Sequence, residues 1–310
     1  MIQMKLLIQT VSIAALLIVA MQSADAQESE YSREGADTCL ACHDDDLTLA
    51  VFRTKHAVPS DSRGPFGHGQ LQCEACHGPG DTHAGRVRRG QERPPISIIF
   101  GTGSVTPLEA QNGACLTCHQ ADIGFSWHTD AHPSDEVACA DCHLSHAATD
   151  PVRQTATQPD VCFACHQIQR SETRKAFAHP ILQGKMDCMG CHDIHGDTVA
   201  TQLARLTVND TCQQCHAEKR GPYLWEHAPV SEDCGLCHSP HGSNHPGMLT
   251  KRAPLLCQSC HSQSGHPSIP QDADGLAAGT PSQFLLGQAC MNCHSQVHGS
   301  NHPSGSKLMR

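Results

Sequence analysis

The sequence predicts an elongated chain of mostly short α-helices and irregular loops, with almost no β-sheet. Three observations support this fold class. Only 4% of the 310 residues are aromatic and 38% are hydrophobic, which makes a thin side-chain core. All twenty cysteines lie in ten Cys-x-x-Cys-His motifs. Glycine and proline, 25 and 19 residues, interrupt the segments between motifs. Something other than side chains must therefore fill the interior.

The N-terminal residues have the pattern of a secretory signal. Lys5 precedes the apolar run LLIQTVSIAALLIVAM, and Ala24-Asp25-Ala26 forms a cleavage site. We expect residues 1–26 to be a cleaved signal peptide, although an uncleaved anchor is the alternative. No later apolar stretch is long enough to span a bilayer. So many cysteines also indicate an oxidising compartment, so we expect residues 27–310 to be a single unit in the periplasm.

The Cys-x-x-Cys-His motif is the attachment signal for c-type haem. Each thiol adds to a vinyl group of the porphyrin, and the adjacent histidine binds the iron. The predicted attachment cysteines are Cys39, Cys42, Cys73, Cys76, Cys115, Cys118, Cys139, Cys142, Cys162, Cys165, Cys188, Cys191, Cys212, Cys215, Cys234, Cys237, Cys257, Cys260, Cys290 and Cys293. The predicted proximal ligands are His43, His77, His119, His143, His166, His192, His216, His238, His261 and His294.

Two other uses of these cysteines explain the sequence less well. Tandem cysteine pairs could form Cys₄ zinc sites. Disulfides within each motif are also conceivable. Neither explains why a histidine follows every second cysteine, so we predict ten covalently attached haem c groups.

Fourteen further histidines remain, and ten irons each need one distal ligand. His195 cannot bind the iron of His192. Their Cα atoms would lie roughly 12 Å apart across a haem, whereas three residues span at most about 10 Å. His195 must therefore serve a neighbouring haem, for which we expect the one on Cys162 and Cys165.

The distal candidates fall into two sets. The set that follows the first motif of each pair is His56, His132, His179, His227 and His266. The set that follows the second motif is His83, His146, His195, His241 and His298. The chain thus divides into five haem pairs, at residues 39–83, 115–146, 162–195, 212–241 and 257–298. From Cys139 to Cys257 the motifs recur every 22–26 residues, which is typical of a repeat array.

Four histidines exceed this count, namely His68, His128, His245 and His302. His68 competes with His83 for the distal role, and His128 competes with His132. We favour solvent or haem-propionate contacts for all four, because ten candidates already match ten irons. Bis-histidine ligation throughout would give low-spin iron at low potential, with no vacant position for a substrate.

Local patterns predict little regular structure. A short helix is expected around residues 209–219, with Asn209 or Asp210 at its start. The longer gaps between motifs are 44–72, 78–114 and 262–289, and the second and third of these should be surface loops. The net charge of −10 argues against a nucleic-acid partner.

Beyond the generic motifs, four stretches are more specific: CHGPGDTH, CHDIHG, CHSPHGSN and the terminal CHSQVHGSNHPSG. In their order, they resemble the periplasmic decahaem cytochromes of the MtrA/MtoA/PioA/DmsE family, over nearly all of the mature chain. The resemblance implies a haem wire docked inside an outer-membrane β-barrel protein of the MtrB/PioB/MtoB type. It also implies exchange with an outer-surface multihaem cytochrome or extracellular metal, and with a periplasmic or inner-membrane electron carrier.

We therefore expect an electron-transfer protein rather than an enzyme. A multihaem reductase needs a five-coordinate iron, often with a lysine ligand, and no Cys-x-x-Cys-Lys motif occurs. The main alternative to the transmembrane conduit is a soluble periplasmic shuttle or electron store without a barrel. The direction of electron flow stays open.

Overall fold

The computed structural model describes residues 30–124, 127, 132, 136–196, 202–261 and 290–309. The predicted signal peptide, His128 and His266 lie outside these residues. The chain divides into two compact units, which are described separately. The first contains residues 57–99 and the described part of Met1–Asp45, and the second contains Asp46–His56 and the described part of Phe100–Arg310.

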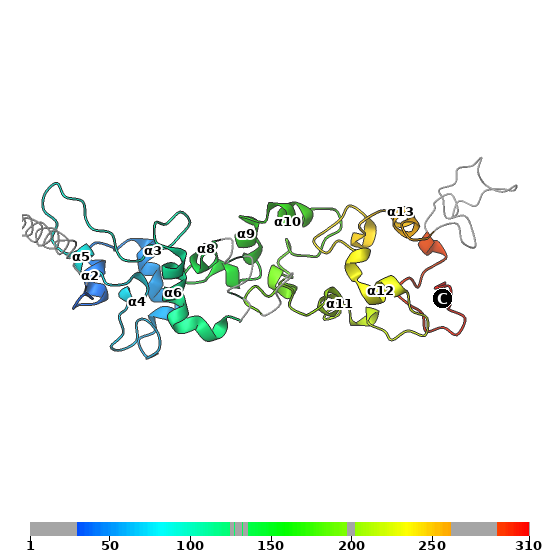
Figure 1. Cartoon of the computed structure of the whole chain (residues 1–310), viewed down its shortest axis with the longest axis horizontal. Helices are drawn as coiled ribbons and strands as arrows, with labels where there is room; N and C mark the ends of the chain where they lie inside the picture. The colour runs from blue at the N-terminus through cyan, green and yellow to red at the C-terminus, as the bar shows by residue number, and fades with distance from the viewer. Residues whose placement is uncertain are drawn as a thin grey trace, which may run out of the picture. The chain divides into compact units, whose positions relative to one another are not determined.

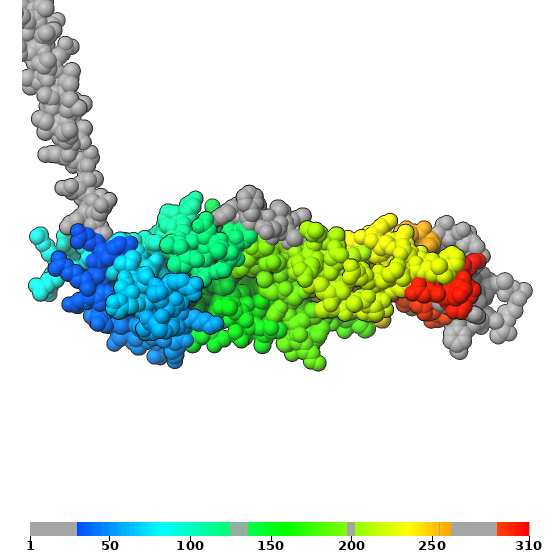
Figure 2. Space-filling view, turned by 90° about the horizontal axis from the view of Figure 1, so that it is seen from below, coloured from blue at the N-terminus to red at the C-terminus, as the bar shows by residue number. Residues whose placement is uncertain are grey.

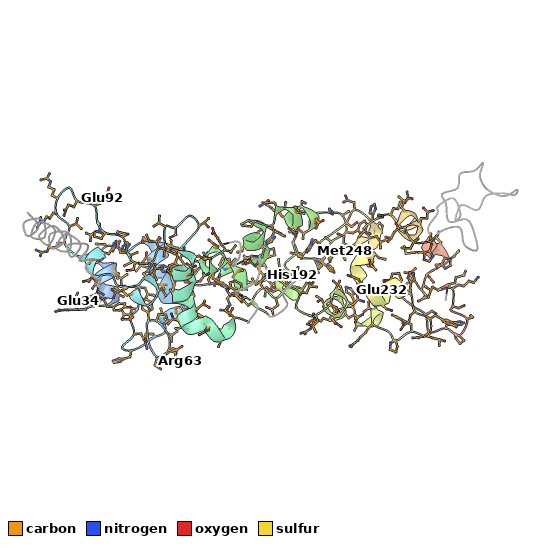
Figure 3. The ribbon with its side chains drawn as sticks, in the orientation of Figure 1. Glu34, Arg63, Glu92, His192, Glu232 and Met248 are labelled. Carbon is orange, nitrogen blue, oxygen red and sulfur yellow. The ribbon has the colours of Figure 1, made fainter. Side chains whose placement is uncertain are left out.

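The first unit consists of three short helices and the irregular chain between them (Figure 1). These helices are α2 (Ala36–Leu40), α4 (Glu74–His77) and α5 (Asp81–Ala84). The buried carboxylate of Glu74 holds them together, because it accepts hydrogen bonds from the backbone amides of Ser32 and Gly80. Glu34, Arg63 and Glu92 lie at the outer edge of this unit (Figure 3).

The second unit contains short helices in chain order, of which α6 has 12 residues and the others have four to six. Its α-helices are α3 (Asp46–Leu49), α6 (Leu108–His119), α8 (Cys139–Cys142), α9 (Gln158–Phe163), α10 (Gln167–Glu172), α11 (Val208–Cys212), α12 (Ala228–Glu232) and α13 (Ala253–Gln258). Its 3₁₀ turns are η1 (Ala50–Arg53), η3 (Gln120–Asp122), η5 (Pro151–Arg153), η6 (Cys188–Gly190), η7 (Ala217–Lys219), η8 (Cys234–Leu236), η9 (Pro246–Met248) and η10 (Cys290–Asn292). The turn η2 (Lys55–Ala57) has residues in both units.

The predicted fold class is confirmed. Within the described residues, extended pairing is limited to four isolated bridges: Phe177 with Ser243, His192 with Leu203, Trp225 with Ser300, and His238 with Leu249. In the second unit, the surfaces coloured green, yellow-green and yellow adjoin one another in chain order (Figure 2). In the described part of the chain, no helix has the length and apolar character needed to cross a membrane.

Side chains supply little of the interior. The buried hydrophobic residues that the structure describes are Ala36, Ala50, Val51, Trp127, Ala138 and Phe163. Buried polar residues are more numerous, and several of them tie two motifs together. Hydrogen bonds from polar side chains therefore provide stability that apolar packing provides in an ordinary domain of this size.

A buried or half-buried amide side chain joins the two motifs of a pair at three places. It lies three or four residues before the first motif, and its oxygen accepts the backbone N–H of the first cysteine of the second motif. The three hydrogen bonds are Cys139 N to Asn112 (2.9 Å), Cys188 N to Gln158 (2.8 Å) and Cys234 N to Asn209 (2.7 Å). These contacts fix the spacing of two motifs that lie 22 to 26 residues apart.

After three of the second motifs the chain turns back and hydrogen bonds to the motif, and we call this segment the return loop. The residue one or two positions after the motif histidine donates its backbone N–H to the carbonyl of a non-glycine residue with positive φ. The contacts are Asp193 N to Gln202 O (2.7 Å), Ser239 N to Met248 O (2.7 Å) and Gln296 N to Leu308 O (2.9 Å). Figure 3 labels Met248 of one return loop and His192 of another. In two of these loops the residue before the left-handed one also turns its carbonyl to the ring of the motif histidine, Gly247 to His238 and Lys307 to His294.

The predicted helix near 209–219 is shorter and starts earlier than expected. Helix α11 spans Val208–Cys212, and Thr207 is the N-cap, because its side chain accepts the backbone N–H of Asp210. Neither Asn209 nor Asp210 caps the helix, so that prediction is wrong. Asn209 is instead used for the cross-link to Cys234.

Gln158 gives a test of the amide cross-links. Its side chain is 4% exposed, and its oxygen accepts the backbone amides of both Cys188 and Met189. Gln158→Ala should lower the free energy of unfolding by about 1–3 kcal/mol, because two part-buried N–H groups lose their acceptor. Thermal unfolding followed by circular dichroism checks this. Gln91→Ala, at an exposed glutamine, is the matched control and should change stability by less than about 0.5 kcal/mol.

Candidate haem-binding sites

Each Cys-x-x-Cys-His motif forms about one helical turn. In nine motifs the backbone N–H of the histidine donates to the carbonyl of the first cysteine at 2.8–3.0 Å, and the tenth motif ends α6. Residues four apart lie on the same face of a helix. Each motif thus presents its first thiol and its imidazole on one side, as a porphyrin held at its edge and at its iron requires.

The first cysteines of the two motifs in each predicted pair lie together. The thiols lie close enough to interact between Cys39 and Cys73, Cys115 and Cys139, Cys162 and Cys188, Cys212 and Cys234, and Cys257 and Cys290. Burial is the main cause that raises the pKa of Cys73 to about 12, which keeps that thiol neutral before haem attachment.

The second cysteines have neighbours in the adjacent pair instead. Cys142 lies close enough to Cys162 and Cys165 for their charges to interact, and the same holds for Cys191 with Cys215 and Cys237 with Cys260. Contacts through first cysteines within a pair thus alternate with contacts through second cysteines between pairs. The attachment points of successive motifs are therefore close from the second pair to the fifth.

Eight of the ten motif histidines face one predicted distal histidine each. The distances between ring centroids are 6.2 Å for His43 and His83, 6.2 Å for His56 and His119, 6.1 Å for His132 and His166, 5.9 Å for His143 and His195, 6.4 Å for His179 and His216, 6.2 Å for His192 and His241, 6.0 Å for His227 and His261, and 6.2 Å for His238 and His298.

This spacing suits one iron between two imidazoles. A metal–imidazole bond is about 2.0 Å and the ring centre lies about 1.1 Å behind its nitrogen, so two rings on one metal should be about 6 Å apart. Ordinary aromatic pairs range over about 4.5–7 Å. The eight distances cover only 5.9–6.4 Å, and every pair joins one motif histidine to one distal candidate. The residues present therefore fit a haem at each of these eight positions.

The pairs follow a simple order along the chain. A histidine after a first motif faces the first motif of the next pair, as His179 faces His216. A histidine after a second motif faces the second motif of the preceding pair, as His241 faces His192. His83 is the exception, because it faces His43 of its own pair.

This order corrects the expected neighbour of His195. The sequence predicts that His195 serves the haem on Cys162 and Cys165, whose motif histidine is His166. The structure instead brings His195 to His143, and His132 faces His166. The spacing of residues along the chain excluded His192 as the partner but could not distinguish between the two remaining neighbours.

The second ring nitrogen, Nδ1, shows which tautomer these histidines adopt. In six of them Nδ1–H donates to a backbone carbonyl at 2.7–3.0 Å: His77 to Ile98, His83 to Pro94, His179 to Pro240, His227 to Val297, His238 to Gly247 and His294 to Lys307. A carbonyl can only accept, so the proton lies on Nδ1 and the lone pair of Nε2 is left for a metal.

Carboxylates take the place of the carbonyl at other histidines, and the sequence analysis missed them. Nδ1–H of His119 donates to Asp122, and that of His143 donates to Asp150, both at 2.7 Å. Glu172 lies 3.3 Å from Nδ1 of His241. An acidic residue three positions after a motif histidine, as in His119 and Asp122, was the only sequence signal available.

Burial keeps several distal candidates neutral. Desolvation lowers the pKa of His56, His195 and His298 below the usual value for histidine. His195 also packs edge-on against Trp127, which is 6% exposed, with ring centroids 5.4 Å apart. A neutral imidazole is the form that binds iron, so this environment favours ligation.

The surplus histidines behave differently. Nδ1 of His302 accepts hydrogen bonds from the backbone N–H and the hydroxyl of Ser304, so its proton lies on Nε2. That tautomer is the opposite of the one seen at the facing pairs. His245 borders a hollow of about 250 Å³ that Lys175 also lines, and His68 is exposed. Contacts with solvent or propionates remain our prediction for these residues.

Two segments of similar sequence position four of the distal candidates. We call residues 240–245 (PHGSNH) the first tail and residues 297–302 (VHGSNH) the second tail. Ser243 exchanges two backbone hydrogen bonds with Phe177, at 2.8 and 2.9 Å, and the carbonyl of Pro240 accepts Nδ1–H of His179. The tail thus positions His241 and orients His179 together. Ser300 repeats the exchange with Trp225, where Val297 orients His227 beside His298.

These features define a class. Ten Cys-x-x-Cys-His turns, with histidine pairs at the spacing of axial ligands, make this chain a c-type cytochrome with multiple covalently bound haems. Family models agree: a doubled CXXCH motif matches residues 179–221 and 227–266, and a model of NrfB-like c-type cytochrome proteins matches residues 73–159.

Relatives narrow the class to a family. The multiheme cytochrome MtrA of Shewanella baltica is 45% identical over 286 residues, which cover 91% of this chain and 84% of that protein. The cytochrome c-type protein NrfB of Haemophilus influenzae is 26% identical over 171 residues, which cover 50% of this chain and 74% of that protein. The chain belongs to the MtrA family of multihaem cytochromes, and it is an electron-transfer protein rather than an enzyme.

Counting altered haems tests the pairing of His195. His195→Ala should leave one haem five-coordinate and high-spin. Adding His143→Ala should keep the number at one, because both histidines would serve one iron. Adding His166→Ala should instead raise it to two. Electron paramagnetic resonance spin counting on the oxidised protein gives the number, and equal counts for both double variants contradict the pairing.

Gly242 tests the docking of the first tail. Its φ of +144° is a region open essentially to glycine alone, and a Cβ there would collide with the carbonyl of Glu172. Gly242→Ala should displace His241 and make about one haem partly high-spin. Gly113→Ala is the control, because nothing lies within 4 Å of the added carbon. A fully low-spin Gly242→Ala protein would contradict the role of the tail.

Proposed function

We propose that this chain binds ten haem c groups, each with two axial histidines, and conducts electrons through them as part of a transmembrane conduit. Each bound haem supplies a one-electron Fe(III)/Fe(II) couple. The observation that carries the proposal is the set of eight histidine pairs at 5.9–6.4 Å. With both axial positions filled, an iron can pass electrons on but offers no site for a substrate.

The five predicted pairs, and their ligands, extend this pattern to the whole chain. In this proposal the motif histidines His77 and His294, and the distal candidates His146 and His266, complete the set of ten irons and ten distal ligands. His77 and His294 also donate Nδ1–H to carbonyls, as the motif histidine His238 does.

The conduit itself rests on the family. We propose that residues 27–310 lie in the periplasm after removal of the signal peptide and dock into an outer-membrane β-barrel protein of the MtrB/PioB/MtoB type. The chain would exchange electrons with a periplasmic or inner-membrane carrier at one end. At the other end the partner is an outer-surface multihaem cytochrome or an extracellular metal.

Haem content is the first test. The intact mass of the exported protein should exceed that of residues 27–310 by ten haems, and a thiol assay should find no free cysteine. All twenty cysteines belong to motifs, so each haem takes two. A mass with fewer haems, or with bound zinc, would contradict the count.

Reconstitution tests the conduit. The chain should co-purify with the barrel protein in detergent. Liposomes holding both should transfer electrons between an internal reductant and an external oxidant much faster than liposomes with the barrel alone. A variant lacking one haem, Cys188→Ser with Cys191→Ser, should bind the barrel but conduct more slowly. Equal rates with and without the cytochrome would leave the periplasmic shuttle as the better account.

A further inference from the structure

The structure describes the Nδ1 partner of the motif histidine in four second motifs, and one of the four differs. His77, His238 and His294 each donate to a backbone carbonyl, at 3.0, 2.8 and 2.7 Å. His143 occupies the same place in its motif, but it donates to the carboxylate of Asp150 at 2.7 Å. One of these four second motifs thus has a charged acceptor in place of a neutral one.

The local structure holds Asp150 in this role. Its second carboxylate oxygen accepts the backbone N–H of Leu144 at 3.3 Å, and its own carbonyl accepts Arg153 N at 3.1 Å at the start of η5. The Asp150 side chain is only 17% exposed. Burial of the carboxylate reduces screening by water, so its charge acts on His143 more strongly than the charge of an exposed carboxylate would.

We infer that Asp150 is a positioning residue that lowers the reduction potential of the haem bound by His143, relative to the haems whose motif histidines bond carbonyls. A carboxylate that accepts Nδ1–H makes the imidazole a stronger donor, and stronger donation stabilises Fe(III) over Fe(II). The negative charge itself has the same sign of effect. This inference rests on the proposed ligation of one iron by His143 and His195.

The chain contains its own control. Asp122 bonds His119 at the same 2.7 Å, but its side chain is 70% exposed and that of His119 is 52% exposed. Solvent screens an exposed pair of this kind. The two pairs share residue types and geometry and differ in burial, so the difference between them measures the buried charge.

The experiment marks one haem and measures its potential. His195→Met should give the haem of His143 a methionine–iron charge-transfer band, which can be followed alone during a redox titration. Adding Asp150→Asn should shift the one-electron equilibrium constant at least tenfold toward Fe(II), a rise of about 59 mV. Asp150→Glu keeps a carboxylate, so the reduction potential of the marked haem should stay close to its value with Asp150 present.

The control repeats this at the exposed pair. In a His56→Met background, which marks the haem of His119, Asp122→Asn should shift the constant less than about threefold. A tenfold shift at Asp150 with haem content and band unchanged supports the inference. An unchanged potential with the band present overturns it and leaves the ligation intact. No band in His195→Met overturns the ligation and the inference with it.

Discussion

Histidine pairs that reach between neighbouring motifs are the interaction on which the rest of this structure depends. Apolar side chains cannot hold the chain together, because only six buried hydrophobic residues are found in the described part. The facing imidazoles bring together segments that are far apart in sequence, such as His179 and His216, or His192 and His241. In the proposed ligation one iron would hold each pair, and the haems would take over the role that a core plays elsewhere.

Local structure serves these pairs in three ways. One helical turn sets each motif, buried amides such as Gln158 hold two motifs together, and tails such as the one around Ser243 position two distal histidines at once. The left-handed residues of the return loops add a carbonyl beside the motif histidine. Strain and buried polarity are therefore concentrated around the ligands, where both fix the direction of an imidazole.

The motifs, the scarcity of β-structure and the pool of distal candidates could be predicted from the sequence, because the chemistry of Cys-x-x-Cys-His is local. The partner of His195 could not. Chain length excludes His192, but either His143 or His166 can be reached, and only tertiary packing selects His143. The Thr207 cap and the carboxylate of Asp150 were missed for a similar reason, since each depends on one side-chain direction.

The alternation of contacts gives the chain a direct route for electrons. First cysteines meet within a pair, and second cysteines approach the next pair, so successive attachment points stay close. Differences in the Nδ1 partners then vary the potential from one haem to another without changing the ligands. Haems with the same axial ligands can in this way differ in reduction potential along the chain.

A density map of the haem-loaded chain is the most direct test of the central claim. It should show each iron between the two histidines that face each other here, with His192 and His241 on one iron and His238 and His298 on another. A map in which the axial ligands of most haems come from within a single pair would contradict the account.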